Sequence, residues 1–255
     1  KTETSSCRAE HGLSIYIEVH GKKILFDFGA SDMFYKNAEN LGIDLSKVDF
    51  AVVSHGHYDH TLGIPRFCEI NKEAPIYIHE NAFRQTYGVK GVKLAERSSG
   101  MSFGKDAFPG RWIFTDGITR VTEDIAISGT IPGALKATEI FYMKNEDGSL
   151  TADDMSHEQF LAIRDEKGVF LFSGCSHRGV IAAVEYCGEI FPNTPIYMFI
   201  GGMHMYHATE KERNEVVENL RNLGVHKIMP VHCTGLVTIA ALKNSLGDDC
   251  IMATV

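Results

Sequence analysis

The sequence has no apolar run long enough to cross a membrane. Its longest runs, such as PIYMFIGGM at 195–203, are far shorter than the roughly 18 to 20 residues that a membrane-spanning helix needs. An excess of positive charge is also lacking, since the net charge is −8 and the pI about 5.8. A phosphate backbone or an anionic membrane surface attracts basic proteins, so we expect neither a nucleic acid nor a membrane as the main partner.

The chain also lacks a cysteine pattern typical of a disulfide framework. Its six cysteines are scattered over 255 residues, a length that buries a substantial core without covalent cross-links. Hydrophobic residues make up 44% and charged residues 23% of the chain, which is typical of a folded globular protein. Two cysteines lie close to histidines, and the pattern as a whole favours a reducing, cytoplasmic environment.

Strand-like and helical patterns alternate along the whole chain. Runs rich in β-branched and aromatic residues predict strands at 13–19, 23–29, 48–54, 75–79, 112–116, 119–128, 159–165, 168–174, 195–202 and 226–232. Helical spacing predicts helices at 32–42, 80–87, 179–191, 209–224 and 235–247. This interleaving predicts an α/β fold in which helices cover sheets, formed as a single domain over residues 1–255.

Two segments interrupt this pattern. Residues 88–110 contain several glycines and serines and show no sustained period, which predicts a loop or a lid. Residues 144–154 (KNEDGSLTADD) form a polar insertion with turn residues. Because long loops in compact domains are often functional, the first segment is a candidate to cover a binding site.

Three histidines and an aspartate crowd into six residues directly after the predicted strand 48–54. His55 and His57 are two residues apart, so their rings point the same way on an extended backbone, and Asp59 and His60 follow in the turn. Burying such groups is costly unless something binds them. Imidazole nitrogen and carboxylate oxygen are ligands that zinc and its first-row neighbours prefer, so the segment predicts a metal site. The alternative is a polar turn in which the histidines are coincidental.

This motif, preceded by the stretch LFDFG and a buried strand, resembles the metallo-β-lactamase superfamily. The resemblance extends over nearly the whole chain and implies an αββα sandwich with one or two metals at the edges of the sheets. It further implies that His55 and His57 bind the first metal, and that Asp59 and His60 bind the second. Asp27 would be a buried carboxylate that orients the loop.

Further stretches narrow the resemblance to one branch of the superfamily. They are EHGLSIYIE at 10–18, SGCSHRG at 173–179, GGMHM at 201–205 and HCTG at 232–235. Together they resemble the branch that contains 7,8-dihydropterin-6-methyl-4-(β-D-ribofuranosyl)aminobenzene 5′-phosphate synthase and many uncharacterised bacterial relatives. The reaction does not follow from the branch, because function resides in the site and not in the fold.

One ligand of the superfamily pattern is missing. Most members carry a histidine ligand in a turn that corresponds here to SGTIPG at 128–133, where no histidine stands near Thr130. The usual bridging aspartate corresponds to Cys175, a candidate ligand because thiolates bind zinc and iron well. A buried, inert cysteine is the alternative. His177, two residues on, is close enough to replace the missing ligand or to carry a proton.

The last ligand of the superfamily pattern corresponds to His232, at the end of the strand 226–232. Cys233 beside it points the other way on an extended backbone, so we expect it to pack in the core. His204, which follows a Gly-Gly pair at a strand end, is expected to line the pocket.

The candidate catalytic residues are Asp59, His177 and His204. His11 is a histidine that either reaches the site or caps a turn. The other histidines have no supporting context and are expected at the surface or in structural roles: His20, His79, His157, His207 and His226.

An anionic small molecule is the expected substrate. The turn GASD at 29–32, with its backbone amides and Ser31, could cradle a phosphate. Arg178 could pair with one, and a solvated surface arginine is the alternative.

Hydrolysis is the default reaction of such a site, because a metal with open positions lowers the pKa of water and polarises a carbonyl or phosphoryl oxygen. We therefore predict a metal-dependent hydrolase that acts on a phosphorylated or pterin-like molecule and holds one or two zinc ions, with iron or manganese as alternatives. The other hypotheses are a pterin-transferring synthase and a protein that binds metal without turnover.

Overall fold

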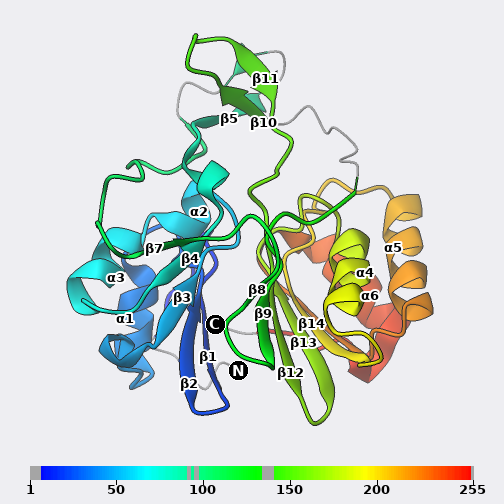
Figure 1. The fold of residues 1–255 in the computed structure, drawn as a ribbon. Helices are drawn as coiled ribbons and strands as arrows, with labels where there is room; N and C mark the ends of the chain where they lie inside the picture. The colour runs from blue at the N-terminus through cyan, green and yellow to red at the C-terminus, as the bar shows by residue number, and fades with distance from the viewer. Residues whose placement is uncertain (1–6, 91–92, 95–97, 134–140, 254–255) are drawn as a thin grey trace. The chain divides into compact units, whose positions relative to one another are not determined.

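The structure is a computed structural model of the 255-residue chain, and it describes residues 7–90, 93–94, 98–133 and 141–253 (Figure 1). Contacts within the chain divide it into two compact units. The first unit comprises residues 1–116, 135–157 and 255, and the second comprises residues 117–134 and 158–254. The polar insertion predicted from the sequence therefore belongs to the first unit, although it lies in the second half of the chain. The single domain expected over residues 1–255 stays a prediction.

The first unit is built on a five-stranded sheet with the strand order β1-β2-β3-β4-β7. Its strands are β1 (Ile15–Val19), β2 (Lys22–Phe26), β3 (Phe50–Val52), β4 (Ile76–Ile78) and β7 (Trp112–Phe114). β1 and β2 form an antiparallel hairpin, and the pairs β2–β3, β3–β4 and β4–β7 are parallel. The carboxyl ends of the parallel strands therefore meet at one edge, which is where α/β proteins place their chemistry.

Helices α1 (Met33–Asn40) and α3 (Ile64–Ile70) lie along one face of this sheet (Figure 1). Phe34 of α1 and Phe67 of α3 are buried in the same apolar core as Leu25 and Ile76 of the sheet. Removing these side chains from water supplies the main stabilisation of the unit. The shorter elements are η1 (Leu45–Lys47), α2 (Tyr58–Thr61) and η2 (Glu80–Phe83).

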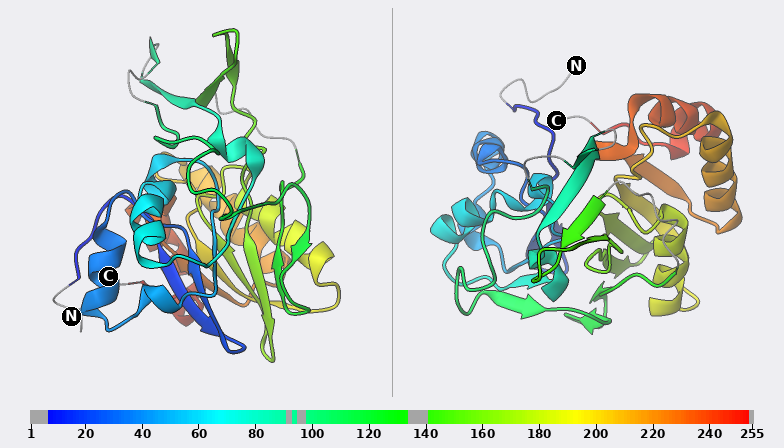
Figure 2. Two further views of the ribbon diagram at one scale, coloured as in Figure 1. Left: turned by 60° about the vertical axis from the view of Figure 1, so that its left-hand side comes forward. Right: turned by 90° about the horizontal axis from the view of Figure 1, so that it is seen from above.

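A small second sheet of the first unit corrects two predictions. It has the strand order β11-β10-β5-β6, with β5 (Thr86–Lys90), β6 (Lys93–Leu94), β10 (Phe141–Lys144) and β11 (Leu150–Ala152) (Figure 1 and Figure 2). The helix predicted over 80–87 is wrong, because η2 ends at Phe83 and a strand begins at Thr86. The loop predicted over 88–110 contains the end of β5 and all of β6, while its residues 91–92 and 95–97 lie outside the described residues. β5 pairs with β10, more than fifty residues away, and this tertiary pairing outweighs the local pattern.

The second unit is built on a six-stranded sheet with the strand order β15-β14-β13-β12-β9-β8. Its strands are β8 (Thr119–Arg120), β9 (Ile125–Ile127), β12 (Leu161–Asp165), β13 (Gly168–Ser173), β14 (Ile196–Gly201) and β15 (Lys227–Pro230). β12 and β13 form an antiparallel hairpin, and β13, β14 and β15 run parallel. The loops that follow β13, β14 and β15 therefore leave the same edge of this sheet.

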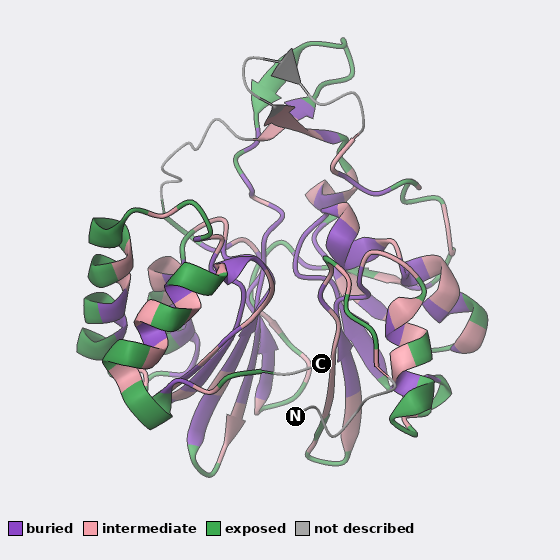
Figure 3. Ribbon diagram, turned by 180° about the vertical axis from the view of Figure 1, so that it is seen from behind, coloured by how far each residue is buried: buried purple, intermediate pink, exposed green. Residues whose placement is uncertain are grey.

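Helices α4 (Val180–Ile190), α5 (Glu210–Asn222) and α6 (Leu236–Leu246) lie along one face of this six-stranded sheet (Figure 1). The 3-10 turns of this unit are η3 (His232–Thr234) and η4 (Gly247–Asp249). Figure 3 shows buried residues along the strands and on the sheet-facing sides of the helices in each unit. The predicted helices 179–191, 209–224 and 235–247 are thus confirmed to within a residue or two at their ends.

Among the described residues, no helix has the length and apolarity needed to cross a membrane.

Candidate metal centre

The histidine cluster leaves the carboxyl edge of the first sheet at the end of β3. His57 caps the short helix α2 with an extended backbone, and His60 donates its backbone N–H to the His57 carbonyl. All four predicted ligands of this stretch are buried, with exposed fractions of 0% for His55, 4% for His57, 7% for Asp59 and 0% for His60. Four polar groups are therefore concentrated where their desolvation must be offset by strong interactions.

Asp27 organises this loop from the end of β2. Its carboxylate accepts hydrogen bonds from the backbone N–H and the hydroxyl of Ser54, both at 2.7 Å. The same carboxylate lies 2.6 Å from Nδ1 of His60, and the Ser54 hydroxyl lies 2.9 Å from Nδ1 of His55. Asp27 is thus the buried, loop-orienting carboxylate that the family resemblance implies, and it leaves Nε2 of His60 to face the rest of the cluster.

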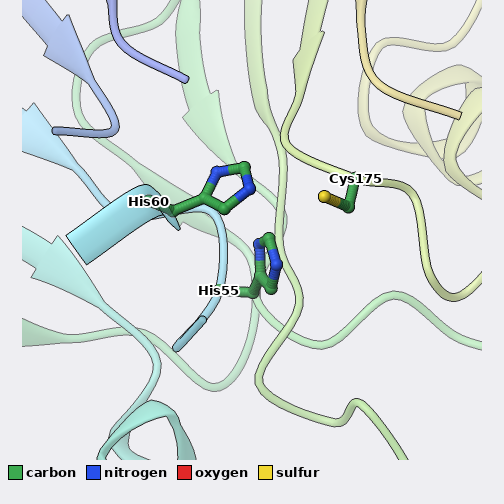
Figure 4. Close-up of side chains that lie close together, drawn as sticks. All are labelled: His55, His60 and Cys175. Carbon is green, nitrogen blue, oxygen red and sulfur yellow. The ribbon is translucent and has the colours of Figure 1, made fainter. Parts of the chain in front are cut away.

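The donor atoms of the cluster form two pairs. Nε2 of His55 lies 3.1 Å from Nδ1 of His57, and Nε2 of His60 lies 3.8 Å from Oδ2 of Asp59. Figure 4 shows His55 and His60, whose ring centroids are 4.2 Å apart. Two ligands about 2.0 to 2.2 Å from one tetrahedral metal lie about 3.3 to 3.6 Å apart. The two separations differ from this range by about 0.2 Å, so small side-chain shifts would let each pair share a metal ion. The residues therefore fit the metal that the motif implies.

The electrostatic environment suits metal ligation. Burial, and after it the neighbouring His157, lowers the pKa of His57 to about 3. His57 is therefore neutral at physiological pH, and a neutral imidazole binds a metal without first losing a proton. His11 lies beside the cluster, with its Nε2 3.3 Å from Oδ2 of Asp59, and this hydrogen bond raises the pKa of His11. The sequence left open whether His11 reaches the site or caps a turn, and the structure places it at the site, beside Asp59.

His157 also contacts this cluster, and the sequence did not point to it. Its ring centroid lies 6.2 Å from that of His55 and 6.0 Å from that of His57, and only 1% of the residue is exposed. Asp153 lies next to it, with Oδ2 3.3 Å from Nε2 of His157. The only sign in the sequence was that Asp153 and His157 are four residues apart, a spacing at which two side chains can pair. About a hundred residues separate this pair from the histidine motif, so the sequence did not connect the two.

The remaining histidines without a sequence context divide into two groups. His79 is buried, and its Nδ1 accepts a hydrogen bond from the backbone N–H of Asn81, so its role is structural. The exposed ones are His20, His207 and His226.

The predicted phosphate cradle at 29–32 is filled by a side chain of the protein itself. The Glu10 carboxylate accepts a hydrogen bond from the backbone N–H of Ala30 at 2.9 Å and another from the hydroxyl of Ser31 at 2.5 Å. A Cβ atom at Gly29 would lie 2.7 Å from the same carboxylate. The turn does bind a carboxylate, through the Ala30 N–H and the Ser31 hydroxyl, but that group belongs to Glu10 and not to a substrate.

The second unit contributes its own group of donors. The donor atoms of Cys175, His232 and Cys233 all lie within 4.8 Å of one another. Cys175, labelled in Figure 4, follows β13, and the other two belong to η3 after β15. Since β13 and β15 end at the same edge of the sheet, the fold unites residues that are more than fifty positions apart.

The expectation that Cys233 points away from His232 is wrong. It assumed an extended backbone, whereas His232 has φ 51° and begins a 3-10 turn. The Cys233 thiol is nevertheless buried, accepts a hydrogen bond from the backbone N–H of His204 at 3.3 Å and donates to the Cys175 carbonyl at 3.7 Å. It therefore combines a packing role with a place among the possible ligands.

His177 and His204 lie together in the second unit, with ring centroids 4.3 Å apart. A buried carboxylate fixes the loop that carries His177: Glu158 accepts hydrogen bonds from the backbone N–H groups of His177 at 2.7 Å and Arg178 at 2.6 Å. The guanidinium group of Arg178 donates to the carbonyl of Gly133. Arg178 therefore makes a hydrogen bond within the protein. The sequence analysis did not identify Glu158, because nothing in the residues around it marks a functional carboxylate.

The turn at 128–133, where the superfamily histidine is absent, is held by a serine. The Ser128 hydroxyl donates to the carbonyl of Gly129 at 2.7 Å and accepts from the backbone N–H of Phe160 at 2.9 Å. Both bonds fix the backbone of the turn, so Ser128 has a structural role.

Comparison with known proteins identifies the family. The sequence model described as the metallo-beta-lactamase superfamily matches residues 8–232. The chain belongs to the metallo-β-lactamase superfamily.

Two relatives and one solved structure place the chain within this superfamily. The chain is 32% identical over 240 residues to 7,8-dihydropterin-6-methyl-4-(β-D-ribofuranosyl)-aminobenzene-5′-phosphate synthase of Methanocaldococcus jannaschii, covering 89% of this chain and 82% of that protein. It is 28% identical over 237 residues to an uncharacterised protein of the same organism, covering 92% and 88%. A crystal structure described as a metal-dependent hydrolase of the β-lactamase superfamily matches with a TM-score of 0.84 and 28% identity, covering 98% of this chain and 91% of that one.

These comparisons confirm the predicted α/β fold class of the metallo-β-lactamase type and the resemblance to the pterin-synthase branch. The clusters of His, Asp and Cys donors support binding of a divalent metal by this superfamily member. The assignment of each residue as a ligand or a catalytic group stays a prediction.

Proposed function

We propose that this chain is a metal-dependent hydrolase that acts on a phosphorylated or pterin-like, anionic small molecule. The observation that carries the proposal is the pair of donor sets in one buried loop, His55 with His57 and Asp59 with His60, at separations compatible with metal ligation. Membership of a superfamily of mostly metal-dependent enzymes and the likeness to a structure described as a metal-dependent hydrolase support it.

The proposed ligands are the six residues that the motif and the resemblance indicate: His55, His57, Asp59, His60, Cys175 and His232. Zinc, as one or two ions, is the proposed metal because these are the side chains that zinc prefers, with iron or manganese as alternatives. When bound, the metal would lower the pKa of water and polarise a phosphoryl or carbonyl oxygen.

The side chains of the protein have separate roles in this proposal. Asp27 holds Nδ1 of His60 and thereby aims Nε2 toward Asp59. Asp59 is a proposed ligand and catalytic residue. His177 and His204, whose rings lie together, are the candidates to bind the substrate or to transfer a proton to it.

A second candidate is a pterin-transferring synthase, because the chain is 32% identical to a protein of that name. In this reaction the aromatic amine nitrogen of the aminobenzene substrate would form a C–N bond to the pterin methylene carbon and lose a proton, while the C–O bond to pyrophosphate breaks. The site would stabilise the departing pyrophosphate. Both candidates need the same metal ligands, so the ligands do not separate them.

A cytoplasmic location is part of the proposal. It is supported by the cysteines, since no two of the six are joined by a disulfide in the described chain.

Metal content and two activity assays test the proposal. Elemental analysis of the purified protein should show one or two equivalents of metal per chain, and phosphoesters should be hydrolysed. Condensation of a dihydropterin pyrophosphate with an aminobenzene ribose phosphate, without phosphoester hydrolysis, would favour the synthase. The His57→Ala variant should lose metal and activity, while alanine at the exposed His226 should retain both. Protein that contains no metal and is unaffected by His57→Ala would contradict both candidates.

A further inference from the structure

The backbone between the two leading histidines of the cluster is held by His157, which lies three residues after the polar insertion at 144–154. Gly56 lies between His55 and His57, and its N–H donates to Nδ1 of His157 at 3.1 Å. The two residues are 101 positions apart in the sequence but belong to the same unit. The hydrogen bond therefore connects the segment that follows the insertion to the backbone that carries both imidazoles.

His157 is close to the cluster, yet its own ring is already engaged. A backbone N–H is always a donor, so Nδ1 of His157 must be the acceptor and the ring proton resides on Nε2. Nε2 lies 3.3 Å from Oδ2 of Asp153, which accepts that proton in a hydrogen bond. Because both ring nitrogens have partners within the protein, His157 acts on the cluster by holding it and not as a ligand.

Asp153 is itself held in place. Its Oδ1 accepts a hydrogen bond from the backbone N–H of Met155 at 2.8 Å, and its side chain is completely buried. A buried carboxylate with two defined partners has little freedom to move. Asp153 therefore fixes both the tautomer and the orientation of the His157 ring, as carboxylates do for histidines near metals.

The surroundings of Gly56 leave the loop little room to adjust. A Cβ atom at Gly56 would lie 2.2 Å from the carbonyl oxygen of Ala82, so only glycine fits there. The ring of Phe141, from β10 of the small sheet, packs against His57 with centroids 4.4 Å apart. The loop is thus bounded by η2, by β10 and by His157, all within the first unit.

We propose that Asp153 and His157 are positioning residues, which hold the Gly56 backbone so that His55 and His57 present their ring nitrogens to one metal ion. This inference rests on the proposed function, because it assumes that the two histidines bind metal. It assigns a role to Asp153 near the end of the polar insertion and to His157 just after it, in a segment that shows none of the usual metal-site spacing.

The test compares two nearly isosteric substitutions. Asparagine places a carbonyl oxygen close to the position of Nδ1 and can accept the Gly56 hydrogen bond, whereas leucine cannot. We expect His157→Leu to weaken Co²⁺ binding about 10- to 100-fold in competition with a chelator and to shift the visible Co²⁺ spectrum. His157→Asn should recover most of the affinity and the wild-type spectrum.

A second readout needs no metal. In the metal-free protein the Gly56 amide should be protected from hydrogen exchange, lose protection in His157→Leu and regain it in His157→Asn.

The control removes a comparable buried hydrogen-bond network elsewhere in the first unit. Asn71 is buried, donates to the carbonyl of Val48 and accepts from the N–H of Ala74. Asn71→Leu should lower the free energy of unfolding yet leave Co²⁺ affinity and spectrum unchanged.

Three results would overturn the inference. Equal Co²⁺ affinity and spectra in wild type and His157→Leu would contradict it while leaving the proposed function intact. Equal losses in the leucine and asparagine variants would show that only the volume of the ring matters. Wild-type protein that binds no Co²⁺ would remove the proposed function and this inference together, and exchange at Gly56 would then report a purely structural bond.

Discussion

The two units bring together their proposed metal ligands in opposite ways. In the first unit, the donors come from one stretch of six residues whose geometry is set by the end of β3 and the start of α2. In the second unit, Cys175 and His232 are separated by two helices and two strands and are brought together only because β13 and β15 end at one edge. A contiguous motif therefore depends on local conformation, whereas a dispersed group depends on the whole sheet.

The strongest test of this contrast is removal of one ligand from the contiguous motif. We expect His57→Ala to reduce the metal content by about one equivalent per chain and to lower activity by more than the roughly 10- to 100-fold that follows loss of a supporting residue. Elemental analysis and initial-rate measurements would show this. Normal metal content in this variant would mean that the motif is not the metal site.

The next test weakens the anchor of the motif and keeps its ligands. Asp27→Asn places an amide N–H₂ group or a single carbonyl oxygen where one carboxylate now accepts three hydrogen bonds. Leaving buried partners unsatisfied should lower the free energy of unfolding by about 3 kcal/mol. Urea denaturation of the metal-free protein measures this value. A loss below about 0.5 kcal/mol would show that the loop holds its shape without Asp27.

A third test separates the dispersed donors from ordinary core cysteines. Cobalt bound by a thiolate gives a sulfur-to-metal charge-transfer band in the near ultraviolet, which we expect in the wild type and not in Cys175→Ser. Cys187→Ser is the matched control, since Cys187 is completely buried in the core of the second unit and burial raises the pKa of its thiol to about 12. A band that survives in Cys175→Ser but disappears in Cys233→Ser would transfer the ligand role to Cys233.

The smallest expected effect is a dependence of stability on pH in the metal-free protein. Burial lowers the pKa of His57 from 6.5 to about 3, so between these values the unfolded chain binds more protons than the folded one. The free energy of unfolding should therefore fall as the pH falls from about 6.5 toward 3. His57→Gln, which has no titrating group, should reduce the slope of this dependence over that range. An unchanged slope would mean that other groups cause it.

The sequence was sufficient for those features that depend on neighbouring residues. The α/β alternation, the β1–β2 hairpin and the helices of the second unit follow from local periodicity. The spacing of the histidine motif was enough to predict that its side chains lie together. The loop position of Asp27 was also expected from the family pattern.

Features that depend on distant pairing could not be predicted in this way. Thr86 to Lys90 form a strand because β10 lies beside them, and no local signal marks that partner. His157 and Glu158 are adjacent residues whose side chains bind backbone N–H groups in different units, at Gly56 and at His177. Such contacts become visible only once the chain is folded.

The Glu10 carboxylate in the turn at 29–32 has a consequence for ligand selection. A phosphate arriving from solution would compete with a tethered anion whose effective concentration at the turn is on the order of millimolar or higher. It would also meet the negative charge of Glu10 as it approached. Glu10 therefore occupies the donors of this turn, and a phosphate-bearing substrate would need other groups to bind it.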